Sequence, residues 1–293
     1  MINLSFVRTF VTLVETGSFV ETARRLDMAQ PTVSQQIQKL ENTLKTVLIQ
    51  RSHSFCSPTR KGLSVLPYAR SLLRSAERFS AAARGDHICI GCSGNIATYF
   101  IAAEIKKFIA AETEALKWDV RTAPNPELGT LIENGEIDLA VMEWPDIRPG
   151  LTVMPWRSEP LVVVLAPDHP LAGSRTIALD ALLDLDLIGG EAGSGTGTLL
   201  AKAFGDRAKQ LRVVRSLHST EAVKNAVRAG LGSSIMLRGA VVDEVMAGQL
   251  AMLTVDGIDL AKSFHIALPA DLPADSLPAR LAAFLTGPQT AAA

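Results

Sequence analysis

Residues 18–44 read SFVETARRLDMAQPTVSQQIQKLENTL, and they decide the fold of the first part of the chain. Ser18, with Glu21 three positions later, has the pattern of a capping box that begins a helix. Residues 27–30 predict a short turn. Pro31 then predicts the first position of another helix, because the missing N–H of proline costs nothing there. The stretch therefore predicts two helices joined by a tight turn.

An amphipathic helix precedes this stretch. Val7, Phe10, Val11 and Val14 repeat at the i, i+3, i+4, i+7 spacing of one helix face. Gly17 is a residue type that ends helices at little cost. Three short helices with apolar inner faces, the last two joined by a tight turn, predict a helix-turn-helix.

The helix that begins at Pro31 carries an uncharged polar face opposite its apolar stripe. Glutamine amides can bond adenine bidentately and hydroxyl groups can pair with several base edges, so this face suits the major groove of double-stranded DNA. A solvated face on an ordinary surface helix would contain the same residue types, but the preceding turn and helix favour DNA. The residues expected to face DNA here are Gln30, Pro31, Thr32, Ser34, Gln35, Gln38 and Lys39.

Two short strands are expected next, at residues 47–49 and 54–56, forming a small β-hairpin wing. Arg51 and Arg60 are expected to bind phosphates beside the groove. Residues 1–86 contain 12 Lys and Arg against 6 Asp and Glu, a net charge of +6, whereas the remaining residues have 17 against 24, a net charge of −7. This split suggests that only the first part of the chain meets a polyanion.

Residues 4–62 contain one set of residues whose order and spacing can be compared with known patterns. The set is Phe10, Gly17, Ser18, Phe19, Ala23, Leu26, Gln30, Pro31, Val33, Ser34, Ile37, Leu40, Glu41, Leu44, Leu48, Arg51, Thr59 and Gly62. This set resembles the N-terminal pattern of LysR-type transcriptional regulators. The resemblance implies a winged helix-turn-helix over residues 1–58 and a sequence-specific DNA-binding transcriptional regulator. The chain departs from the pattern at Ala29, Lys45, Ile49 and Pro58, where serine, glycine, phenylalanine and leucine are usual.

Residues 59–86 are expected to form a linker, with a helix from residue 64 to about residue 83. Its apolar stripe has no obvious core of its own to cover, which favours pairing with a second copy of the chain. The resemblance implies the same dimerising role. The alternative is a helix that packs on the C-terminal domain. The stripe consists of Leu66, Leu72, Leu73, Ala76 and Phe79.

Residues 87–293 alternate between strand and helix patterns, which predicts an α/β domain. We expect a two-lobed, periplasmic-binding-protein-like effector domain, with two strands crossing between the lobes. Lobe I would comprise residues 87–161 and 266–293, and lobe II residues 162–265. The stretches 135–140 and 229–232 also resemble LysR effector domains. The expected elements are strands at 87–91, 117–122, 137–142, 161–166, 187–188, 211–214, 233–236 and 265–268, and helices at 97–111, 126–134, 197–205, 220–229 and 277–285.

Ligands of such sheets lie at the carboxyl ends of strands, beside helix N-termini. Four loops meet this condition and are rich in hydroxyl, amide or glycine groups that suit a small anion. Each loop alone would also fit a plain helix cap, but their convergence on one cleft favours a ligand site. Arg238 would add a counter-charge if its side chain points inward. The residues expected to bind the effector are Ser93, Gly94, Asn95, Asn125, Ser194, Gly195, Thr196, His218, Ser219 and Thr220.

No catalytic constellation, cofactor motif or metal-ligand spacing stands out, so we expect no enzyme activity, cofactor or metal. Residues 193–197 lack the Gly-Lys-Ser/Thr ending of a phosphate loop. Cys89 and Cys92 form a lone CxxC, and packing residues are favoured over a redox pair or zinc ligands. The rival hypotheses are an enzyme with an N-terminal DNA-binding domain and a solute-binding protein.

The expected location is the cytoplasm, because three cysteines make no disulfide framework and no secretory signal stands out. The expected partners are promoter or operator DNA, the small-molecule effector, and further copies of the chain in a dimer and a tetramer. RNA polymerase is left open as another partner. The sequence does not distinguish an activator from a repressor.

Overall fold

The computed structural model describes residues 1–51, 56–113, 115–190 and 195–287. These residues form two compact units, residues 1–87 and residues 88–293, and each unit has its own hydrophobic core. None of the helices in the described residues is long and apolar enough to cross a membrane.

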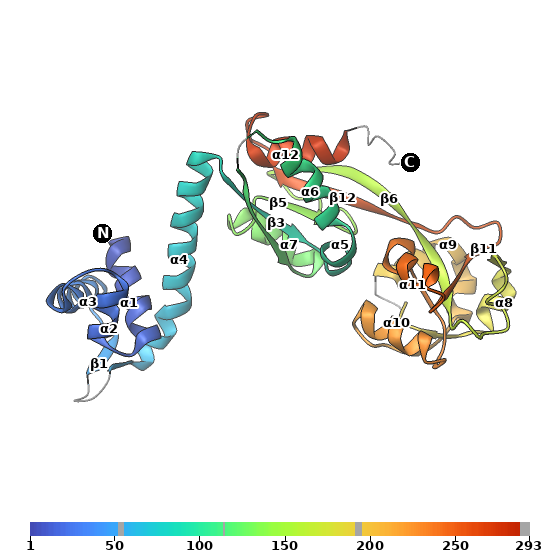
Figure 1. The fold of residues 1–293 in the computed structure, drawn as a ribbon, viewed down its shortest axis with the longest axis horizontal. Coiled ribbons are helices and arrows are strands. Elements are labelled where there is room, and N and C mark those ends of the chain that lie inside the picture. The colour runs from blue at the N-terminus through green and yellow to red at the C-terminus, as the bar shows by residue number, and fades with distance from the viewer. Residues whose placement is uncertain (52–55, 114, 191–194, 288–293) are drawn as a thin grey trace. The chain divides into compact units, whose positions relative to one another are not determined.

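The first unit contains three short helices, a two-stranded hairpin and one long helix (Figure 1). Its centre is formed by Phe10 and Leu13 of the first helix, Ile37 of the third, and Leu48, all less than 2% exposed. This confirms the expected winged helix-turn-helix. The elements are α1 (Leu4–Thr16), α2 (Phe19–Arg25), α3 (Gln30–Leu44), β1 (Ile49–Arg51), β2 (Cys56–Pro58) and α4 (Arg60–Arg84).

The junction between α1 and α2 follows the expected residue types, with one difference. Gly17 has a φ of 65°, and its N–H donates to the carbonyl of Leu13 at 2.9 Å. The Ser18 hydroxyl accepts from the backbone N–H of Glu21 at 3.3 Å. The second hydrogen bond of the predicted capping box, from the Ser18 backbone N–H to the Glu21 carboxylate, is wrong. The Glu21 carboxylate instead accepts from Nε of Arg24 at 2.9 Å, because the guanidinium is a stronger, charged donor.

Both ends of α3 differ slightly from expectation. The helix begins at Gln30, so Pro31 occupies its second position and not its first. At the other end Lys45 has a left-handed φ of 51°, and its N–H donates to the carbonyl of Asn42 at 3.3 Å. A non-glycine residue in this conformation costs roughly 1–2 kcal/mol, which explains why glycine is the usual residue there.

The strands of the wing lie two residues later than predicted. They pair antiparallel, with Ile49 opposite Pro58, and the hairpin tip at 52–55 lies outside the described residues. The first strand was predicted to begin too early because Leu48 is apolar and buried like a strand residue. Its backbone N–H, however, donates to the Glu41 carboxylate at 2.7 Å. Gly62 lies against the same segment: a Cβ at this position would be 2.2 Å from the carbonyl oxygen of Leu48.

Helix α4 begins at Arg60, earlier than expected, and its 25 residues span about 38 Å. Part of the predicted stripe covers the core of its own unit: Leu66 and Leu73 are half-buried against it. The expectation that α4 has no core of its own to cover is therefore wrong. The large apolar side chains that stay exposed, and so can meet another chain, are Leu63, Tyr68, Leu72 and Phe79.

The second unit is an α/β domain with two lobes (Figure 1). The elements of lobe I are β3 (His87–Cys92), α5 (Gly94–Tyr99), α6 (Ile101–Ala111), β4 (Lys117–Thr122), α7 (Asn125–Glu133), β5 (Leu139–Met142) and α12 (Leu277–Thr286). The elements of lobe II are β7 (Thr176–Ile177), α8 (Leu179–Leu183), β8 (Asp186–Ile188), α9 (Gly195–Phe204), β9 (Arg212–Arg215), α10 (Thr220–Arg228), β10 (Ser234–Leu237), α11 (Val242–Met246) and β11 (Ala251–Val255).

Two long antiparallel strands, β6 (Leu151–Leu165) and β12 (Ala261–Pro269), join the lobes. The first half of β6 pairs with β12, which also pairs with β5 of lobe I, and its second half pairs with β10 and β11 of lobe II. Figure 1 shows β6 running from one lobe to the other. This confirms the two crossing strands expected from the sequence.

The differences from the predicted elements have local causes. β6 begins ten residues earlier than expected because its first half is partly exposed and lacks a continuous apolar run. The helix predicted at 97–111 is two helices, α5 and α6, interrupted at Phe100. The Phe100 ring packs edge-on against Phe264 of β12, with ring centroids 5.2 Å apart. The short elements β7, α8, α11 and β11 were not predicted.

Candidate functional site

The outer face of α3 is polar and exposed. Its inner face buries Val33, Ile37 and Leu40, each no more than 2% exposed. Among the residues expected to contact DNA, Ser34 is half-buried. The other expected residues in this region are all exposed: Gln30, Pro31, Thr32, Gln35, Gln38 and Lys39.

The two arginines expected to bind phosphate lie outside α3, Arg51 on β1 and Arg60 on α4. Arg60 is exposed at the start of α4. The backbone of Arg51 pairs within the hairpin, while its side chain lies outside the described part of the chain. The ammonium of Lys39 lies 5.9 Å from the ring centroid of Phe6 on α1, which holds it beside the polar face. The exposed outer face of α3 thus carries neutral amide and hydroxyl groups together with one cation, Lys39.

A cavity of about 730 Å³ lies between the two lobes of the second unit. The four loops expected to surround a ligand all contribute to it, because strand ends and helix N-termini of both lobes meet there. Ser194 lies outside the described residues. The remaining expected residues all line the cavity: Ser93, Gly94, Asn95, Asn125, Gly195, Thr196, His218, Ser219 and Thr220.

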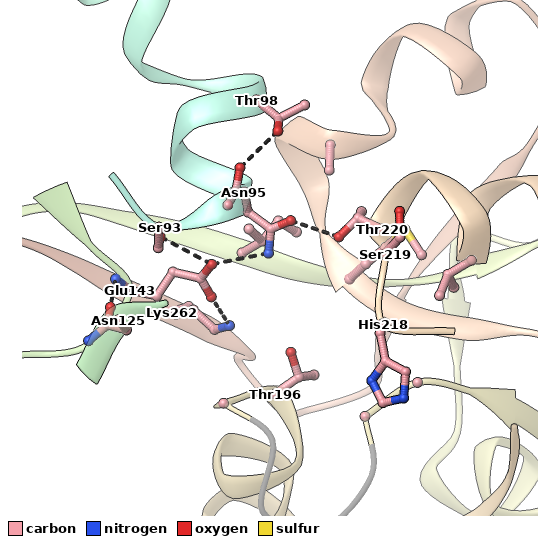
Figure 2. Close-up of a pocket in the computed structure, with 18 of the residues that line it drawn as sticks. Ser93, Asn95, Thr98, Asn125, Glu143, Thr196, His218, Ser219, Thr220 and Lys262 are labelled. Carbon is pink, nitrogen blue, oxygen red and sulfur yellow. Dashed lines mark hydrogen bonds and ion pairs between the residues drawn. The ribbon is translucent and has the colours of Figure 1, made fainter. Parts of the chain in front are cut away.

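A buried ion pair in this cavity was not predicted from the sequence. Glu143, directly after β5, and Lys262, on β12, line the cavity and are 9% and 5% exposed. The Lys262 ammonium lies 2.6 Å from Oε2 of Glu143 (Figure 2). A charged residue at the end of the buried run 139–142 was the available signal for Glu143. Its partner is far away in sequence and could not be identified from spacing.

Two predicted anion donors instead contact this carboxylate. Figure 2 shows Ser93 and Asn95 facing Glu143, whose Oε1 accepts from Ser93 Oγ at 3.4 Å and from Asn95 Nδ2 at 3.1 Å. Asn125 orients the backbone beside it: its Oδ1 accepts from the Glu143 N–H at 2.8 Å, and its Nδ2 donates to the Trp144 carbonyl at 3.1 Å. These donors thus bind a carboxylate that belongs to the chain itself.

Hydrogen bonds also connect the lobes across the cavity. Thr220 Oγ1 donates to Asn95 Oδ1 at 2.7 Å, and the Tyr99 hydroxyl donates to Glu221 Oε1 at 2.7 Å. Burial, and then the bond to Glu221, raise the pKa of Tyr99 above its ordinary range, so the hydroxyl remains a donor. Bonds from Lys224 and then Tyr99 lower the pKa of Glu221, so it remains an acceptor.

A third contact between the lobes involves an aromatic ring. Trp144 of lobe I lies so close to Gly195 of lobe II that a Cβ on this glycine would be 2.6 Å from the indole. Both residues line the cavity. Gly195 is the first residue of α9, so the ring lies beside the N-terminus of that helix.

The other residues of lobe II that were expected to bind the effector contribute polar groups to the cavity. Ser219 caps α10, its hydroxyl accepting from the Ala222 N–H at 3.4 Å. His218, with a left-handed φ of 50°, precedes it. Figure 2 places Thr196 and His218 on the side of the cavity away from Ser93. Arg238 is exposed and is not among the lining residues, so the condition for a counter-charge from it, an inward-pointing side chain, is not met.

The two cysteines of the CxxC lie on β3. Cys92 is fully buried, and burial raises the pKa of its thiol, with the neighbouring Cys89 adding to the shift. A thiol held protonated is a poor nucleophile and a poor metal ligand. Within the described residues, no three His, Cys, Asp or Glu side chains are grouped so as to hold a metal ion.

The chain thus combines a winged helix-turn-helix with a two-lobed domain around a polar cleft. Two family models match the chain. The model for the bacterial regulatory helix-turn-helix protein, lysR family, matches residues 4–63, and the model for the LysR substrate binding domain matches residues 81–287. The chain therefore belongs to the LysR family of transcriptional regulators.

Individual proteins agree with this assignment. The putative HTH-type transcriptional regulator protein PtxE of Stutzerimonas stutzeri is 41% identical over 196 residues, which are 67% of this chain and 100% of that protein. The RuBisCO operon transcriptional regulator of Allochromatium vinosum is 26% identical over 273 residues, 90% of this chain and 89% of the relative.

Solved structures show the same architecture. Full-length CbnR in complex with its target DNA has a TM-score of 0.74 at 20% identity, covering 97% of this chain and 99% of CbnR. A C206 mutant of Corynebacterium glutamicum OxyR has a TM-score of 0.67 at 28% identity, covering 97% of this chain and 90% of that one. The CbnR similarity concerns the fold alone.

Proposed function

We propose that the outer face of α3 and the wing bind a specific DNA site, and that a small anion entering the cleft changes this DNA binding or promoter activation. The observation that carries the effector part is the convergence of four polar loops, from both lobes, on one cavity of about 730 Å³. A concave site of this size with a few convergent polar groups is typical of a small-molecule site.

The donors around the cavity favour an anion. The N-termini of α9 and α10 both border it, and each carries about half a positive charge. Hydroxyl groups of Thr196 and Ser219 add neutral donors. A ligand that touches both lobes has different contacts in open and closed forms, and that difference can shift the equilibrium between arrangements of the protein.

The DNA part is tested by comparing two variants on a selected genomic fragment and on random DNA. Gln35→Ala should weaken binding to the selected fragment by about 1–3 kcal/mol and leave binding to random DNA nearly unchanged. Arg60→Ala should weaken both and reduce the salt dependence, because a phosphate contact is independent of sequence. Equal losses of Gln35→Ala on both DNAs would refute the groove assignment.

The effector part is tested by a thermal-shift screen of small carboxylates, phosphates, sulfur oxyanions and aromatic acids, because a bound ligand stabilises the fold by mass action. A hit should lose affinity in Thr196→Ala and keep it in Thr176→Ala. Thr176 is exposed on β7 and is not among the residues lining the cavity, so it is the matched control. An unchanged affinity of Thr196→Ala would place the site elsewhere.

Self-association is part of the same proposal. The exposed side chains Tyr68, Leu72 and Phe79 of α4 offer an apolar face for a second copy of the chain. Paired DNA-binding units reach two half-sites at a fixed spacing, which requires such a dimer. A tetramer built from two dimers, and contact with RNA polymerase, would follow at the promoter.

A further inference from the structure

The charges that line the cleft are already paired within the protein. Among the described lining residues, Lys262 is the single Lys or Arg, and Glu143 and Glu221 are the carboxylates. The Lys262 ammonium lies 2.6 Å from Glu143, and the Lys224 ammonium lies 2.8 Å from Glu221. The cation in the cleft is therefore occupied by a carboxylate of the chain.

An effector anion cannot take Lys262 without displacing Glu143. Glu143 is 9% exposed, and its backbone N–H is held by Asn125. A displaced carboxylate would remain buried without its counter-ion, which is strongly unfavourable. Its other partners, Ser93 and Asn95, would lose their acceptor as well.

We propose that Glu143 determines the charge of the effector: by holding Lys262 it restricts the cleft to singly charged anions, which neutral donors such as the Thr196 hydroxyl can bind. Glu143 is thus a specificity-determining residue that acts through Lys262. This inference rests on the proposed function for the identity of the site. It adds that a doubly charged anion is disfavoured, because among the described lining residues no Lys or Arg is free to balance its second charge.

The test uses the full chain with sulfate as the dianion and acetate as the monoanion, against chloride at equal ionic strength. Unfolding is followed by tryptophan emission, which reports only the second unit because Trp118, Trp144 and Trp156 are the three tryptophans of the chain. Glu143→Gln leaves Lys262 unpaired. It should raise the affinity for sulfate at least about tenfold, because a charged donor becomes available.

The double variant Glu143→Gln, Lys262→Met is the matched control. It lacks both charges, so it should show no gain of sulfate binding, while any general stabilisation of the fold by sulfate affects it equally. If Glu143→Gln is unfolded in dilute buffer, millimolar sulfate should restore its folding transition and should not do so for the double variant.

Sulfate binding by the wild-type chain as tight as by Glu143→Gln would overturn the inference. An absence of sulfate binding or rescue in Glu143→Gln would overturn it too. The proposed function is tested separately by the acetate series and the wider screen. If no anion binds the wild-type chain but Glu143→Gln gains sulfate, the anionic effector is refuted, whereas the masking of Lys262 by Glu143 is supported.

Discussion

Replacing Thr220 by Val should loosen the two lobes of the effector domain. Valine keeps the branched shape of threonine but removes the hydroxyl that donates to Asn95 Oδ1 at 2.7 Å. A hydrogen bond between neutral side chains contributes about 1 kcal/mol net. Because 1.4 kcal/mol corresponds to a factor of ten, its loss should raise the ratio of open to closed domains about fivefold. The Tyr99–Glu221 bond stays in place, so the closed form should persist.

Trp144 is a built-in reporter for this change, because its ring lies against Gly195 of the other lobe. With Trp118 and Trp156 changed to Phe, the remaining emission comes from Trp144 alone. Opening of the cleft should expose the indole further than its present 40%, shift its emission to longer wavelength and raise its quenching by acrylamide.

Thr98→Val is the matched control for this experiment. Thr98 also lines the cavity, but its hydroxyl donates to the Gly94 carbonyl at 2.8 Å within α5, so no contact between the lobes is lost. Quenching should rise in Thr220→Val and remain at the starting value in Thr98→Val. Equal quenching in both variants would refute the assignment of the Thr220–Asn95 bond as a link between the lobes.

Three further outcomes follow from the structure. Gly62→Ala should destabilise the first unit by about 1–3 kcal/mol, measured by circular dichroism on heating, because the added Cβ would be 2.2 Å from the Leu48 carbonyl oxygen; an unchanged melting curve would contradict this. Phe79→Glu should abolish dimers in light scattering, because Phe79 is 79% exposed on the free face of α4; a stable dimer would move the interface elsewhere. Burial lowers the pKa of His265 below its ordinary 6.5, against a smaller opposing bond to Ser263. The unfolded chain therefore takes up a proton first, and stability should fall as pH drops below about 6.5; His265→Gln should show a smaller fall than the wild-type chain between pH 7 and 5.

Local chemistry was enough to predict the DNA-binding unit. Gly17 and Ser18 set the junction of α1 and α2 where the sequence placed it, because caps and helical periodicity depend on residues within a few positions of one another. Most loops around the cleft were predictable for a related reason. In an α/β domain the strand ends and helix N-termini meet at one edge, whatever the detailed packing is.

The tertiary structure alone decided which groups those loops would meet. Glu143 and Lys262 are separated by 119 positions, and their pairing depends on the crossing of β12 beside β5, which no local periodicity encodes. The same dependence on packing turned Leu66 and Leu73 of α4 toward their own unit and left Phe79 outside. A sequence pattern shows that a helix face is apolar or that a strand end is charged. The partner of that face or charge is selected by which distant segments come together, because burial and ion pairing are properties of the assembled core.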